Sequence, residues 1–316
     1  NTAQDLKVNF IRASHYPYTR YISQLCDELG ILLWEEIPVY WNINWSNAKT
    51  KTSAKTMLTQ MIHRDWNRAS VIIWSIGNET PFSDARMDFM IDLKETAEGL
   101  DSSRLISAAL LSGSVEQFRS LTYFLAKEGL KHSFVSDYEK AIFRQIVSQL
   151  QPLYGSMDAF RINIKDPLAE HLDIIAYNEY FGWYYTSFIV DQLGVEESTL
   201  RKLMFKLMPS IKIESQYKKP IHLSEFGAGA KRNFKADGGI WSEEYQEDVY
   251  RHQLEMIQNN DQIQGLSPWI LKDFRSMMRP LAGVQDFYNR KGLVDEDGKK
   301  KKAFKVLQQF YQDEWE

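Results

Sequence analysis

The sequence has little of what marks several large classes of protein. It holds one cysteine, Cys26, in 316 residues, so it can form no intrachain disulfide. No apolar run reaches the roughly 18 residues of a membrane span, and no signal peptide opens the chain. The net charge of −4 argues against a nucleic-acid-binding surface. We therefore expect a soluble protein that binds neither nucleic acid nor membrane, in the bacterial periplasm or the cytoplasm.

Several catalytic motifs are also missing. The six histidines show no H-E-x-x-H spacing and no Cys/His pattern of a metal site. No G-x-S-x-G elbow of a serine hydrolase is present. No G-x-G-x-x-G turn follows a predicted strand, as a dinucleotide-binding fold would require. These absences predict a protein without a metal ion or an organic cofactor.

What the chain does contain is a repeating order of strands and helices. Apolar, β-branched segments alternate with helical patterns such as Tyr18–Gly30, Ser53–Arg68, Asp84–Leu100 and Lys301–Asp313. Near-continuous apolar strands between helices indicate a parallel sheet that is covered on its faces. The seven predicted strands are Val8–Tyr16, Ile31–Pro38, Val71–Thr80, Ser103–Leu110, His171–Tyr180, Pro220–Gly227 and Gln262–Phe274.

Polar or aromatic residues of chemical interest lie near the carboxyl ends of six of these strands. That is where a (β/α)₈ (TIM) barrel has its active site, so we predict this α/β fold. The competing fold, a doubly wound open sheet, would gather its ligand groups at one switch point. The segment 111–170 breaks the repeat and is too long for a connection, so we expect an excursion over the barrel mouth. The strand-end residues are His15, Glu36, Asn78, Glu79, Asn178, Glu225 and Trp269.

Two of the acids in this list, Glu79 and Glu225, stand out, because each follows an apolar strand and is followed by small or turn residues. A single acid at such a position is more often a salt-bridge partner than a catalyst. Two acids, one of them preceded by Asn78, favour a catalytic pair. Glycoside hydrolases use one carboxyl as the acid and the other as a nucleophile or base. Carboxyl groups about 5–5.5 Å apart go with retention, and about 6.5–9.5 Å with inversion.

Five motifs resemble, in order, the barrel domain of glycoside hydrolase family 2, and most of all the β-glucuronidases. They are "NFIRASHYPY", "WSIGNE", "NEYFGWY", "LSEFG" and "PWILKDF". The resemblance implies that Glu79 is the general acid/base and Glu225 the nucleophile of a retaining enzyme. It also implies that Asn78 binds the sugar 2-hydroxyl, and that Arg12 and His15 support the floor of the site and the nucleophile.

The same resemblance extends to the sugar pocket. It implies that Tyr180, Tyr184 and Trp269 line the subsite, and that Asn289 and Lys291 bind a uronic acid carboxylate. An ammonium and an amide suit a carboxylate and would gain little from a neutral hydroxymethyl group. Near this asparagine some glucuronidases have an arginine; here Gln285 stands there and Arg279 lies further back.

The resemblance covers nearly all of residues 1–316, which we interpret as one glycosidase barrel. It implies that the first strand of the barrel and the β-sandwich domains before it are absent from this chain, and that a homo-oligomer could form through those domains. Hydrolysis of terminal β-D-glucuronides is the predicted function. The alternatives are a β-galactosidase of the same family, with the same two glutamates, and a sugar-binding module without catalysis.

Overall fold

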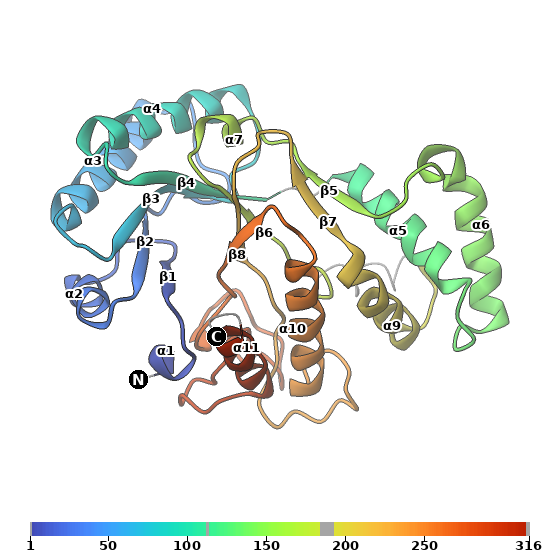
Figure 1. Ribbon diagram of the computed structural model, residues 1–316. Helices are drawn as coiled ribbons and strands as arrows, with labels where there is room; N and C mark the ends of the chain where they lie inside the picture. Colours follow the sequence, from blue (N-terminus) through green and yellow to red (C-terminus); the bar gives the residue numbers. More distant parts are fainter. Residues whose placement is uncertain (1, 112–113, 184–192, 314–316) are drawn as a thin grey trace.

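The computed structural model describes residues 2–111, 114–183 and 193–313, which are built around a sheet of seven parallel strands (Figure 1). The strands follow one another in chain order and curl into an incomplete barrel, with β1 and β9 at its edges. A doubly wound sheet would reverse this order, so the prediction of a barrel fold is confirmed. The strands are β1 (Phe10–Ala13), β2 (Leu32–Glu36), β3 (Val71–Asn78), β4 (Leu105–Leu110), β6 (Ile175–Asn178), β8 (Ile221–Glu225) and β9 (Ile263–Leu266).

Helices connect these strands and cover the outer face of the sheet (Figure 1). Helix α2 ends at Gly30, whose φ of 67° lies in the left-handed region that glycine adopts without strain. None of the described helices is long and apolar enough to cross a membrane. The helices of this layer are α1 (Thr2–Asp5), α2 (Arg20–Leu29), α3 (Ala48–Asp65), α4 (Asp84–Leu100), α10 (Glu243–Gln258) and α11 (Lys302–Asp313).

A separate layer lies beside the barrel, at the right of Figure 1. The long segment before β6 supplies most of it, and capping boxes at Ser114 and Ser136 start its two long helices. Two short strands, absent from our prediction, pair in parallel beside these helices. The elements of this part are α5 (Val115–Gly129), α6 (Asp137–Tyr154), β5 (Arg161–Ile164), α7 (Leu168–His171), α9 (Glu197–Leu207), η1 (Met208–Ser210) and β7 (Lys212–Ser215).

Two predicted boundaries are wrong by five residues or more. Helix α3 begins before Ser53, because the Asn47 side chain caps it by accepting bonds from Lys49 and Thr50. The last strand ends at Leu266 rather than at Phe274. The chain then runs over the end of the barrel and forms a small antiparallel pair, β10 (Phe274–Arg275) with β11 (Tyr288–Asn289).

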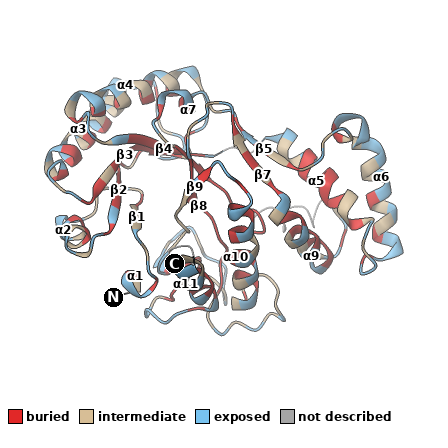
Figure 2. Ribbon diagram, viewed as in Figure 1, coloured by how far each residue is buried: buried red, intermediate tan, exposed pale blue. Residues whose placement is uncertain are grey.

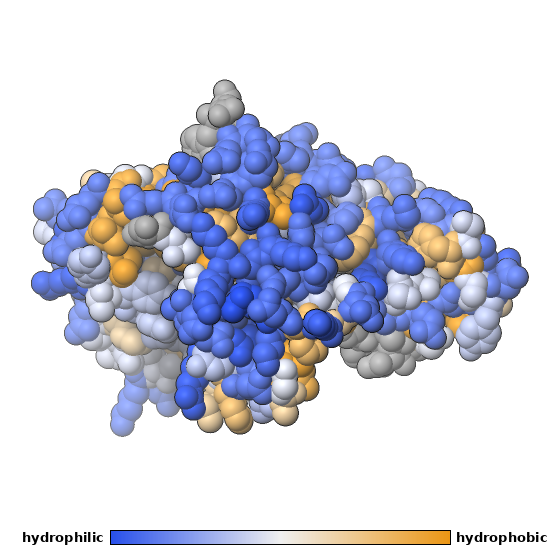
Figure 3. Space-filling model, turned by 90° about the horizontal axis from the view of Figure 1, so that it is seen from below, coloured by the Kyte–Doolittle hydropathy of each residue, from blue (hydrophilic) through white to orange (hydrophobic). Residues whose placement is uncertain are grey.

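The inner and outer faces of the sheet follow from the alternation of side chains along each strand. On β2, Trp34 and Glu36 point into the barrel, whereas Glu35 points out and pairs with Arg64 of α3. The central strands are almost wholly buried (Figure 2). On the face seen from below, hydrophilic residues predominate and hydrophobic ones show in scattered areas (Figure 3). Buried side chains therefore pack on both faces of the sheet, against the helices on its outer face and against one another on its inner face.

Candidate active site

A pocket of about 520 Å³ opens at the carboxyl ends of β3, β6 and β8. Arg12 lies next to it, where it bonds to residues of the lining. Tyr184 lies outside the described residues. The other site residues predicted from the sequence all line the pocket: His15, Asn78, Glu79, Tyr180, Glu225, Trp269, Asn289 and Lys291.

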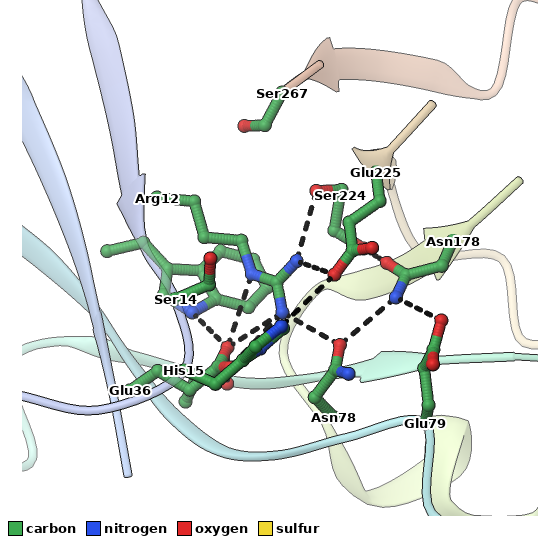
Figure 4. A network of polar contacts seen from close by, with 12 residues as sticks. Arg12, Ser14, His15, Glu36, Asn78, Glu79, Asn178, Ser224, Glu225 and Ser267 are labelled. Carbon is green, nitrogen blue, oxygen red and sulfur yellow. Dashed lines mark hydrogen bonds and ion pairs between the residues drawn. The ribbon is translucent and has the colours of Figure 1, made fainter. Parts of the chain in front are cut away.

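Glu225, the last residue of β8, is held by partners on both carboxyl oxygens, and Figure 4 shows its contact with Arg12. Arg12 Nη1 lies 2.9 Å from Oε1, and the Tyr180 hydroxyl donates to Oε2 at 2.6 Å. His15 Nε2 lies 3.8 Å from Oε1. A cation and a hydrogen-bond donor together fix the direction of this carboxylate.

Beneath Glu225, Arg12 also pairs with Glu36, a fully buried acid on β2. Burial by itself would raise the pKa of Glu36, but the charge of Arg12 and the hydrogen bond from His15 outweigh it and hold that pKa below its usual range. Ser75 Oγ and Trp34 Nε1 donate to the same carboxylate, at 2.9 and 3.1 Å. Arg12 thus joins two carboxylates, and its own position is fixed by Glu36 from below.

Glu79 follows β3 and faces the same pocket with a different set of donors. Asn178 Nδ2 donates to Oε1 at 2.9 Å, and Trp41 Nε1 donates to Oε2 at 3.0 Å. The backbone of Glu79 has φ = 50°, which is uncommon for a residue with a side chain. Its amide donates to Ala109 O on β4, which anchors this turn. No cation bonds to Glu79 among the described contacts, in contrast to Glu225.

Two asparagines connect the two acids (Figure 4). Asn78 Oδ1 accepts a bond from Arg12 Nη2 at 2.8 Å and another from Asn178 Nδ2 at 3.0 Å. Asn178 Oδ1 in turn accepts from Ser224 Oγ at 2.7 Å. Because both amide oxygens are engaged within the network, each amide group has a defined orientation.

The far side of the pocket is basic. Lys291 is buried, and its Nζ lies 4.2 Å from the centre of the Tyr180 ring. Asn289, at the end of β11, lines the pocket next to it. Arg279 lines it as well, because the turns between β10 and β11 fold it back toward Asn289. A cavity of about 230 Å³ adjoins this side and is lined by the same three residues among others.

A buried ion pair supports the loop that carries Lys291. Lys301 Nζ lies 2.8 Å from Asp273 Oδ1 and donates to the carbonyl of Arg290 at 3.0 Å. Asp273 also accepts the amide of Gly292 at 2.8 Å. Burial is the largest influence on both ions; it raises the pKa of Asp273 and lowers that of Lys301, against their mutual attraction. The pair fixes the residues on either side of Lys291.

His15 and Trp269 form the wall between Glu225 and the barrel edge. Their rings stack with centroids 5.0 Å apart and an interplanar angle of 20°. Trp269 lies three residues beyond the end of β9, and its amide donates to Phe226 O next to Glu225. We expected it at the end of the last strand; the loop backbone, instead of a strand, positions it.

Four further residues belong to the site, although no role was predicted for them: Glu36, Trp41, Asn178 and Arg279. Glu36 and Asn178 could be found from their place at strand ends. Trp41 and Arg279 lie in loops, and no local pattern distinguishes them. Within the described ranges, no group of His, Cys, Asp and Glu has the arrangement of a metal site.

The geometry agrees with a comparison against protein families. A family model described as "Glycosyl hydrolases family 2, TIM barrel domain" matches residues 1–314. The chain belongs to glycoside hydrolase family 2. The family 2 resemblance that we drew from five motifs is therefore confirmed over the whole barrel.

Individual proteins of this family are similar over different extents. A beta-glucuronidase of Paenibacillus borealis is 24% identical, over 97% of this chain and 44% of its own length. A beta-galactosidase of Thermoanaerobacterium thermosulfurigenes is 39% identical, over 32% of this chain and 13% of its own. A crystal structure of a family 2 beta-galacturonidase from Eisenbergiella tayi superposes with a TM-score of 0.70 and 23% identity, over 99% of this chain and 46% of that one. The chain spans less than half the length of these proteins.

Proposed function

We propose that this chain is the catalytic barrel of a retaining β-glycosidase that hydrolyses β-linked uronides, with β-D-glucuronides as the first candidates. One observation carries the proposal: two glutamates from different strands face one pocket, and only Glu225 has a cation bonded to it. Two carboxyl groups in unlike surroundings suit the two roles of a glycosidase.

In the first step Glu225 attacks the anomeric carbon. Arg12 and Tyr180 aim its carboxylate, and Glu79 gives its proton to the glycosidic oxygen as the bond to the leaving group breaks. The products are a glycosyl ester on Glu225 and a released alcohol. Asn78, fixed by Arg12 and Asn178, is placed to bind the sugar 2-hydroxyl, a bond that strengthens in the transition state.

In the second step Glu79, now ionised, takes a proton from water. The oxygen of that water attacks the anomeric carbon, and the ester to Glu225 breaks. The sugar leaves with the configuration it had in the substrate. Two inversions at one carbon require that both acids reach it, which their shared pocket allows.

The basic side of the pocket supports a uronide. Lys291 is buried at this side, and a buried ammonium is stabilised by an anionic ligand group. Asn289 can add an amide donor and Arg279 a second cation. A neutral hydroxymethyl group would leave Lys291 without that compensation. The names of two relatives, a beta-glucuronidase and a beta-galacturonidase, agree with this substrate class.

Turnover of matched substrates tests the proposal. The protein should hydrolyse p-nitrophenyl β-glucuronide or β-galacturonide faster than the β-galactoside, and nuclear magnetic resonance should show the β-anomer as the first product. Lys291→Ala should cost the uronide at least about tenfold more in kcat/KM than the galactoside. The control is Lys305→Ala on α11, which does not line the pocket.

Three other outcomes would each contradict a part of this proposal. Hydrolysis of the galactoside alone, which the partial match to a beta-galactosidase makes a specific alternative, would refute the uronide assignment. Binding of glucuronate without turnover of any glycoside would indicate a sugar-binding module. The α-anomer as first product would refute the double displacement.

A further inference from the structure

Trp41 occupies an unusual place next to Glu79. The loop after β2 runs along β3, where Tyr40 bridges to Asn78 and the amide of Trp41 donates to Asn78 O at 3.0 Å. Trp41 has φ = 58°, in the left-handed region, and its indole turns back to reach Glu79. Its side chain is nevertheless 48% exposed. A large exposed aromatic residue bonded to a carboxyl group of the site calls for a functional explanation.

We propose that Trp41 is a positioning residue for Glu79 and, with Tyr40, one wall of the subsite for the leaving group. The proposal rests on the assignment of Glu79 as the general acid. It names the substrates as β-glycosides whose leaving group has a flat apolar face, either an aromatic ring or a sugar ring.

The bonding of Glu79 carries the first half of this proposal. Its two oxygens accept bonds from two separate parts of the chain, Oε1 from Asn178 on β6 and Oε2 from Trp41. An indole N–H can only donate, so Trp41 turns the carboxyl plane of Glu79 toward its own side of the pocket. Without this donor the carboxyl group loses one of the two bonds that fix its direction.

The aromatic surface carries the second half. The rings of Tyr40 and Trp41 meet edge to face, with centroids 5.4 Å apart and an angle of 81°. Tyr40 is 40% exposed, and both residues line the pocket on the side of Glu79. A leaving group that receives a proton from Glu79 must pass this surface. Stacking against it places the glycosidic oxygen near the donor.

Two substitutions at Trp41 test the two parts of the proposal. Trp41→Phe removes the indole N–H, and Trp41→Ala removes the aromatic ring as well. The first substitution therefore removes one hydrogen bond to Glu79 and keeps an aromatic ring at this position. It should lower kcat roughly tenfold for alkyl glycosides and less than about twofold for p-nitrophenyl glycosides, which need little protonation. Trp41→Ala should in addition raise KM for aromatic leaving groups. Trp66→Phe, on an exposed tryptophan that does not line the pocket, is the control.

Equal losses for both leaving groups would overturn the positioning role. An unchanged KM in Trp41→Ala would overturn the subsite. Fluorescence supplies a readout that needs no turnover: the emission of Trp41, taken as wild type minus Trp41→Phe, should shift in a Glu79→Leu background, where the indole N–H loses its acceptor. A wild-type protein without glycosidase activity would refute the proposed function, whereas an unshifted emission would refute the contact itself.

Discussion

The interior of the barrel has two layers, and the same strands build both. Phe10 and Trp34 belong to the lower, apolar layer, and Arg12 and Glu36 follow two residues later on the same faces of β1 and β2. His222 and Ser224 repeat this step on β8. In the upper layer a buried acid keeps a lowered pKa because Arg12 pairs with it. In the lower layer burial lowers the pKa of His222 to about 3, and the charge of Arg12 adds to it.

Burial therefore has opposite outcomes in the two layers: the side chain stays charged where it has ionic partners and neutral where it has none. A charge is stable in the upper layer because each ion has a counter-ion and donors within reach. In the lower layer His222 stays neutral and bonds to Ser267 at 2.8 Å, between the rings of Phe10 and Trp34. A Cβ on Gly265 would lie 2.4 Å from the Nδ1 of His222, so only a glycine fits at this position.

The largest effect is expected at Glu225 in the upper layer. Glu225→Gln keeps the shape of the side chain and removes the nucleophile, so kcat should fall by roughly four orders of magnitude or more. Circular dichroism should show the wild-type fold. Glu98→Gln on the surface of α4 is the matched control. Turnover near the wild-type rate in Glu225→Gln would remove this residue from the mechanism.

Arg12→Met should have the next largest effect, and on stability. It leaves Glu36 buried without its cation, which should lower the free energy of unfolding by about 3–5 kcal/mol in urea titrations. The double variant Arg12→Met/Glu36→Leu should recover part of this loss, because no unpaired charge remains. If the double variant is as unstable as the single one, the loss comes from packing and not from charge.

A pair of serines compares a charged with a neutral acceptor. Ser75 donates to the Glu36 carboxylate, and Ser107 donates to a backbone carbonyl, Ile174 O, each at 2.9 Å. Ser75→Ala should cost about 1.5–3 kcal/mol of unfolding free energy and Ser107→Ala about 0.5–1.5 kcal/mol. Chemical denaturation of both variants measures the difference. Equal losses would mean that the charge of Glu36 adds nothing to its bond.

The lower layer should make the stability depend on pH. The pKa of His222 is about 3 in the folded protein and 6.5 as its ordinary value, so below pH 6.5 the unfolded chain binds the extra proton. The folded protein therefore loses stability as the pH falls, because His222 stays neutral in it: the free energy of unfolding should drop by about 2 kcal/mol between pH 7 and pH 5. His222→Gln should flatten this slope, and the exposed His171→Gln should not. A slope unchanged in His222→Gln would place its origin elsewhere.

Much of the site could be predicted because parallel strands bring their carboxyl ends to one edge. Glu79, Glu225, Asn78 and His15 were recognisable from their position after apolar strands. Trp41 was not, since it reaches Glu79 only through the bridge of its loop to β3. Arg279 lies further back in the sequence than the arginine of some glucuronidases, and the turns between β10 and β11 bring it to the pocket beside Asn289. The strands β5 and β7 were missed because four residues carry little periodicity.

The order of strands and helices, and the residues at the strand ends, follow from the sequence alone. Apolar periodicity is a local property, and a parallel sheet turns it directly into one active-site edge. The interaction partners of these residues depend on the folded barrel. Arg12 bonds to Glu225, which is 213 positions away in the sequence. The neighbouring acids Glu35 and Glu36 point to opposite faces of the sheet and pair with different arginines. Hydrogen bonds and ion pairs depend on fractions of an ångström between segments that only the folded barrel brings together.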